Sequence, residues 1–119
     1  MIGGSFATHP GGDNMTYTVN IKFDSDTVIS DIDDFEVSSE QYYLHVDPVV
    51  KVLATTEFFN PENNPYTSTK YTDIPVVWTK MWGKGRVFYT SLGHCDKIFD
   101  IQEAGEILRR GLLWAGGKM

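Results

Sequence analysis

The alternation of apolar and polar side chains predicts a strand over residues 17–23, near the start of the chain. Every second residue there is apolar and the residues between are polar, which is typical of a strand with one buried face. The residues of the apolar face are Tyr17, Val19, Ile21 and Phe23. Residues 49–56 are instead β-branched or apolar almost throughout, which predicts a strand covered on both faces. Residues 36–46 are predicted to end in a further strand.

A β-hairpin is predicted over residues 75–92. Two segments rich in strand-forming residues flank a Gly-Lys-Gly turn, and such turns commonly join antiparallel strands. Trp78 and Trp82 are four residues apart, so an extended chain places them on the same face. Before the hairpin, residues 58–73 are rich in proline and asparagine. We expect them to form a long loop, and loops of more than about 12 residues are usually functional or mobile.

The pattern of the last twenty residues predicts one helix. Apolar side chains recur at helical spacing from about residue 101 to residue 114. Asp100 and Glu103 have the spacing of a capping box at its beginning, and Gly116 and Gly117 are expected to end it. With about five strands and one firm helix, we expect a mixed α/β fold in a single domain, residues 1–119.

Length and charge exclude several classes of protein. The chain has 119 residues, of which 16 are acidic and 10 basic, so its formal net charge is −6. A protein that follows nucleic-acid phosphates needs a basic surface, and we therefore expect no nucleic-acid partner. No apolar run approaches the roughly 20 residues that span a bilayer, and no signal-peptide pattern is visible, so we expect no membrane partner.

Sequence motifs exclude the common catalytic classes. The chain has no Gly-x-Ser-x-Gly elbow, no His-Glu-x-x-His pair and no Walker loop. Its single cysteine, Cys95, excludes an intrachain disulfide and a zinc site made of several thiolates. A lone cysteine fits a reducing compartment, and we expect a cytoplasmic protein.

Two of the three histidines stand in glycine-rich segments. His9 precedes Pro10, which holds it extended, so its side chain either points into a cleft or lies on a loop surface. His94 follows a β-rich run, at a position where strand ends open into clefts, and Asp96 is near enough to orient its imidazole; the alternative is a purely structural position. The third histidine, His45, fits a solvent-facing or sheet position.

Glu40 is the carboxylate that stands out. It precedes two tyrosines, and an acid beside aromatic rings is a common grouping in sugar sites; the alternative is a solvated acidic turn. Two histidines and one carboxylate suffice to bind a metal or to perform acid–base chemistry. Sequence spacing alone does not show that the three side chains meet.

Five segments, in order along the chain, resemble the ThuA-like (trehalose utilisation) family. Residues 3–10 resemble its Gly-Gly-x-Phe-x-x-His-Pro segment, and residues 34–43 resemble its segment with Phe and Asp-Glu-x-Tyr. Residues 52–55 are similar to the strand that follows. Residues 75–94 resemble the most distinctive stretch of the family, and residues 112–116 match its close.

The resemblance implies an α/β fold of the class I glutamine-amidotransferase type, with a flavodoxin-like layered sheet. The chain resembles the C-terminal half of the family's domain, with its β-hairpin and C-terminal helix, and would be truncated at the N-terminus. A half-length layered domain lacks helices that cover its sheet, so we expect a homo-oligomer. The competing expectation is that residues 58–73 fold back as the cover.

The resemblance also implies a function in the catabolism of trehalose or a related disaccharide. His9, Glu40 and His94 match polar motif positions of the family and would line a pocket that binds or processes a sugar. Glu40 would be the acid or base, and the histidines would bind sugar hydroxyls or a divalent metal. The alternative is a non-catalytic fragment or remnant that acts as a binding or association module. Neither the motifs nor the resemblance identifies a cofactor.

Overall fold

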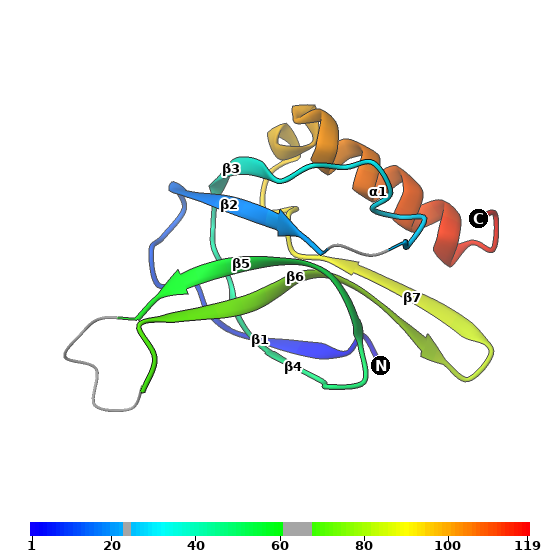
Figure 1. The fold of residues 1–119 in the computed structure, drawn as a ribbon, viewed down its shortest axis with the longest axis horizontal. Helices are drawn as coiled ribbons and strands as arrows, with labels where there is room; N and C mark the ends of the chain where they lie inside the picture. Colours follow the sequence, from blue (N-terminus) through cyan, green and yellow to red (C-terminus); the bar gives the residue numbers. More distant parts are fainter. Residues whose placement is uncertain (23–24, 61–67) are drawn as a thin grey trace.

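The computed structural model describes residues 1–22, 25–60 and 68–119. These ranges contain seven strands, one 3₁₀-helix and one α-helix (Figure 1). The strands are β1 (Gly4–Thr8), β2 (Met15–Ile21), β3 (Phe35–Ser39), β4 (Tyr43–Val46), β5 (Lys51–Phe59), β6 (Tyr71–Trp82) and β7 (Gly85–Thr90). They are followed by the 3₁₀-helix η1 (Asp96–Asp100) and by α1 (Gln102–Ala115). None of the helices in this part of the chain is long and apolar enough to cross a membrane.

The strands form two sheets. The larger sheet has the order β3-β2-β5-β6-β7, and β1 pairs with β4 in the smaller one. Each pairing between described strands is antiparallel. Figure 1 shows α1 on one side of the larger sheet and the β1–β4 pair on the other. The chain is therefore built in three layers, with the larger sheet in the middle.

Two groups of buried side chains hold these layers together. In the first group, Val19 of β2 and Ile107 of α1 are almost fully buried between the helix and the larger sheet. In the second, Leu44 of β4 packs with Trp78 of β6 between the two sheets. The indole N–H of Trp78 also donates to the carbonyl oxygen of Ile2 at 2.8 Å. This bond ties the beginning of the chain to the central sheet.

Two strands confirm the predicted burial patterns. In β2, Tyr17 and Val19 are buried while Thr18 between them is exposed. The expected end of this strand at Phe23 lies outside the described residues. In β5, four successive residues, 53–56, are buried, so both faces of the strand are covered. Residues 36–46 contain parts of two strands, β3 and β4, where one was expected.

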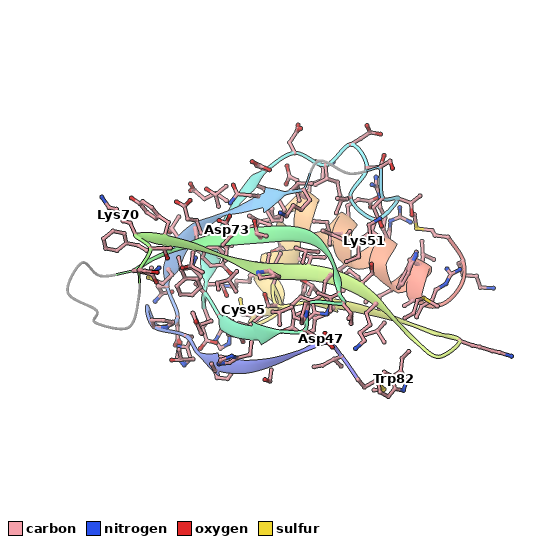
Figure 2. The ribbon with its side chains drawn as sticks, turned by 60° about the horizontal axis from the view of Figure 1, so that its bottom comes forward. Asp47, Lys51, Lys70, Asp73, Trp82 and Cys95 are labelled. Atoms are coloured by element: carbon pink, nitrogen blue, oxygen red, sulfur yellow. The ribbon has the colours of Figure 1, made fainter. Side chains whose placement is uncertain are left out.

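The predicted hairpin is also present. β6 and β7 pair with Trp82 opposite Gly85, so the connecting turn has two residues where three were expected. The pairing of β6 with β7 has no register shift, which places Trp78 and Trp82 on the same face of β6. Trp78 is fully buried, whereas Trp82 is exposed near the tip of the hairpin (Figure 2).

The position of the C-terminal helix is confirmed, but its predicted capping box is wrong. Asp100 belongs to η1, and Ile101 precedes α1 without a side-chain capping bond. The other end is as expected: Gly117 has a φ of 72°, and the N–H of Lys118 donates to the carbonyl of Leu113 at 2.8 Å. This is the glycine-dependent way in which many helices end.

The predicted loop over residues 58–73 is wrong at both ends. β5 continues to Phe59 and β6 begins at Tyr71, and these two residues pair across the strands. Their rings are in contact, with centroids 5.7 Å apart. Residues 61–67, within the expected loop, lie outside the described part of the chain. The second face of the larger sheet is covered by the β1–β4 pair, a cover that the sequence pattern did not predict.

In the described residues, the fold is a mixed α/β arrangement in which strands predominate and one α-helix comes last. The flavodoxin-like layering is not confirmed. A flavodoxin-like sheet is mainly parallel, with helices on both faces. Here the described strand pairings are antiparallel, and a helix covers one face of the larger sheet while a second sheet covers the other.

Candidate functional site

Two neighbouring segments of the chain pass from one sheet to the other and carry His9 and Glu40. We call these segments crossings. One leads from β1 to β2 and the other from β3 to β4. The two crossings are aligned by strand register, because β1 pairs with β4 up to Thr8 and Tyr43. The pairing of β2 with β3 begins at Met15 and Ser39. The chain therefore leaves each sheet at paired residues, and the two crossings lie side by side.

The carboxylate of Glu40 lies between two imidazoles. His9 is in the crossing after β1, Glu40 is in the crossing after β3, and His94 follows β7. Nδ1 of His94 is 3.2 Å from Oε2 of Glu40, and Nδ1 of His9 is 3.7 Å from Oε1. The Glu40 side chain is 10% exposed, whereas those of His9 and His94 are 42% and 41% exposed. The buried acid is thus flanked by two imidazoles that solvent can reach.

Aromatic side chains hold Glu40 in place. The hydroxyl of Tyr17 donates to the carbonyl oxygen of Glu40 at 3.0 Å, and burial, with a smaller contribution from Tyr42, raises the pKa of Tyr17 to about 12. Burial and then a hydrogen bond to Glu40 raise the pKa of Tyr42. The ring of Phe6 packs against both His9 and Tyr42, with centroid distances of 6.1 and 5.1 Å. The acid is therefore fixed through both its backbone and its side chain.

A fourth polar residue, Asp13, belongs to the same region. One donor atom from each of His9, Asp13 and Glu40 lies within 4.8 Å of the other two. Asp13 is exposed and stands in the turn that leads into β2. In addition, Nδ1 of His9 is buried without a hydrogen-bond partner among the described residues.

The structure does not show the expected pocket lined by His9, Glu40 and His94: among the described residues, the nearby cavity of about 620 Å³ is lined by other side chains. Its wall includes Pro10 and Gln41, the chain neighbours of His9 and Glu40. The amide of Gln41 is held by donating to the carbonyl oxygen of Glu57 at 3.1 Å. The aromatic residues of the wall are Tyr17, Phe58 and Phe59. Ligand sites commonly have about 300–1,000 Å³ and combine apolar walls with a few fixed polar groups.

The expected meeting of His9, Glu40 and His94 is confirmed, while their roles remain predictions. His45 lies exposed in β4, as expected. The expected orienting contact between Asp96 and His94 is not formed in the described part of the chain, where His94 is oriented by Glu40. Asp13 was missed because an aspartate after two glycines is typical of a turn, and only the tertiary structure brings it to Glu40.

The fold and the site define an α/β protein with a buried acid between two histidines. A sequence model of the family described as ThuA, trehalose utilisation, matches residues 1–115. This match covers almost the whole chain, and the protein belongs to the ThuA family. A search of curated proteins gave no match, and neither did a search of solved structures.

Proposed function

We propose that this protein binds and processes trehalose or a related disaccharide at the site formed by His9, Glu40 and His94. The membership of the trehalose utilisation family supports the class of ligand. The single observation that carries the proposal is the buried Glu40 carboxylate between imidazoles from distant parts of the chain. Placing a nine-tenths buried acid beside two titratable groups is typical of acid–base sites.

Each side chain has a distinct role in this proposal. Both histidines turn Nδ1 toward Glu40, which leaves Nε2 of each ring for the ligand. An imidazole nitrogen donates to or accepts from a sugar hydroxyl according to its protonation. Glu40 is the acid or base that exchanges a proton with the sugar. The Tyr42 hydroxyl, hydrogen-bonded to Glu40, keeps the carboxylate in one orientation.

The adjoining cavity supplies the room for the rest of the sugar. Its wall combines the aromatic ring of Phe59, which is 57% exposed, with the polar side chains of Gln41 and Glu57. A sugar ring presents apolar C–H faces and polar hydroxyl edges, so it requires both kinds of wall. The grouping around Glu40 binds the ring of the disaccharide that reacts, and the cavity binds its other ring.

A thermal-shift panel of disaccharides and 3-keto-sugars tests the proposal. A ligand bound only by the native state stabilises it by about 2.7 kcal/mol at a hundredfold excess over Kd. We expect at least one sugar to raise Tm at millimolar concentration, and Glu40→Gln to weaken this effect. The matched control is Glu36→Gln, because Glu36 is an exposed glutamate in β3.

Chromatography of the sugar after incubation then shows whether the bound sugar is also changed. A panel in which no sugar raises Tm would contradict the proposal. It would favour a binding or association module without catalysis.

We further propose that the chain self-associates through an edge of the larger sheet. β3 and β7 are the edge strands, and beside β7 the side chains of Met81 and Trp82 are 54% and 56% exposed. Unpaired strand edges and exposed apolar side chains favour contact with a second copy. Sedimentation at micromolar concentration is expected to show a species larger than the 13.4 kDa chain, and a clean monomer would reject the proposal.

A further inference from the structure

We propose that His9, Asp13 and Glu40 bind one divalent transition-metal ion at the two crossings between the sheets. Binding of the ion does not depend on the proposed sugar function. The three donors come from two segments that strand pairing holds side by side, so the site is a property of the fold. A bound ion also offers the adjoining cavity a place for sugar oxygens.

The distances between the donor atoms are close to those of a metal site. The three donors lie within 4.8 Å of one another. Metal–ligand bonds to nitrogen and carboxylate oxygen are about 2.0–2.2 Å, so two donors on one zinc ion are at most about 4 Å apart. Less than about 1 Å of closure is therefore needed, and Asp13 is the residue that can supply it. It is exposed, in a turn, and follows Gly12, whose φ is 74°.

The imidazole of His9 has a nitrogen with no hydrogen-bond partner among the described residues. Its Nδ1 is buried, makes no hydrogen bond within the described residues and lies 3.7 Å from Oε1 of Glu40. Buried polar atoms are usually satisfied, and an orphaned one requires an explanation such as an ion. A cation between this nitrogen and the carboxylates satisfies His9, Asp13 and Glu40 together.

His94 supports the same site from the other side of the carboxylate. It contacts Oε2 of Glu40, whereas Oε1 faces His9. His94 is thus a positioning residue that orients the acid and leaves Oε1 for the ion. Such outer partners typically change metal affinity by about 10–100-fold when they are removed.

The donor set selects the class of ion. Imidazole nitrogen suits zinc, iron, copper and nickel, whereas magnesium and calcium prefer sites made of oxygen alone. One imidazole and two carboxylates therefore favour Zn²⁺ over Mg²⁺, and Mn²⁺, which also suits carboxylates, is expected to bind less tightly than Zn²⁺. Three protein ligands leave at least one coordination position open, which is the arrangement found in metal sites that take a substrate or water.

Calorimetric titration of the full chain with Zn²⁺, Mn²⁺ and Mg²⁺, in the absence of any sugar, tests the site. We expect one Zn²⁺ per chain, weaker binding of Mn²⁺ and no binding of Mg²⁺. Asp13→Asn is the principal variant, because Asp13 is exposed and its replacement should not disturb folding, which thermal unfolding without metal will check. It should weaken Zn²⁺ binding by about tenfold or more.

Two control variants exclude binding elsewhere. His45→Gln removes an exposed histidine outside the site, and Cys95→Ser removes the exposed free thiol. Both are expected to bind Zn²⁺ like the wild type. Absence of Zn²⁺ binding by the wild type, or unchanged binding by Asp13→Asn, would overturn the metal site. Sugar titrations repeated with a chelator report on the proposed sugar function alone, so the two proposals can fail separately.

Discussion

Two glutamates of this protein each face two basic side chains, but they do so in opposite settings. Glu106 of α1 accepts hydrogen bonds from Arg109 at 2.7 and 2.8 Å and from Arg110 at 2.6 Å, all within one turn of the helix. Glu40 faces His9 and His94, which are far from it in the chain.

The comparison separates a structural ion pair from a candidate functional one. Arginine is always protonated, so the hydrogen bonds from Arg109 and Arg110 keep Glu106 charged and lower its pKa to about 2. Pairs at this spacing on a helix surface contribute little to stability. An imidazole, unlike a guanidinium, can donate or accept a hydrogen bond, and the Glu40 side chain is only 10% exposed. The difference indicates that Glu40, not Glu106, is placed to act on a ligand.

The largest expected difference concerns ligand affinity. Glu40→Gln should weaken binding of the stabilising sugar by about tenfold or more, because hydrogen bonds to charged groups contribute about 1.5–3 kcal/mol. Glu106→Gln should leave the affinity unchanged, since the side-chain partners of Glu106 among the described residues are arginines of its own helix. Calorimetry on both variants measures the two effects. Equal losses of sugar affinity in the two variants would contradict the distinction between Glu40 and Glu106.

A smaller effect is expected from the tyrosine that anchors Glu40. Tyr17→Phe removes the hydroxyl that donates to the Glu40 carbonyl, so the free energy of unfolding should fall by about 1 kcal/mol at neutral pH. The pKa of Tyr17 is raised from 10.0 to about 12, and the native state favours the neutral hydroxyl. The wild type should therefore lose this stability as the pH rises from about 10 to 12.

Denaturant unfolding between pH 7 and pH 12 measures both effects of Tyr17→Phe. The matched control is Tyr43→Phe, because Tyr43 is exposed in β4. If Tyr17→Phe and Tyr43→Phe show the same pH dependence, Tyr17 does not anchor the site.

The smallest effect is expected at the helix surface. Glu106→Gln should lower Tm slightly at pH 7, because it removes the charge that faces Arg109 and Arg110. The folded-state pKa of Glu106 is depressed from 4.5 to about 2, so the stabilisation is present above pH 4.5 and is lost as the pH falls to about 2. Melting curves of the wild type and of Glu106→Gln over this pH range, with and without added salt, measure this stabilisation. A difference in Tm that is as large at pH 2 as at pH 7 would argue against this origin.

The parts of the fold that repeat a local pattern could be predicted from sequence. The alternation around Tyr17, the apolar run of β5 and the helical spacing of α1 each reflect burial by neighbouring layers. The smaller sheet could not be predicted in this way. β1 is mostly exposed and contains glycine, serine and threonine, so its pairing with β4 leaves no periodic signal. The extension of β5 and β6 into the expected loop could not be predicted, because the prolines and asparagines between the two strands are typical of a loop.

The candidate site, like the fold, could be predicted only in part from the sequence. His9, Glu40 and His94 were predicted because their motifs resemble a family, and in the structure each of them follows the end of a strand. The proximity of Asp13 to Glu40 could not be predicted, because it depends on the strand register that aligns the two crossings. That register is set by pairing between residues far apart in the chain. The role of Glu40 in orienting His94 could not be read from sequence, where Asp96 is much closer.

The central claim is that His9, Glu40 and His94 act as one unit, and a double-mutant cycle on sugar affinity tests it most directly. His9→Gln, His94→Gln and the double variant are titrated with the sugar that stabilises the wild type. Because both imidazoles face the same carboxylate, their effects should be coupled by about 0.5–3 kcal/mol. Effects that add within about 0.5 kcal/mol would mean that the histidines act independently, and would contradict the account.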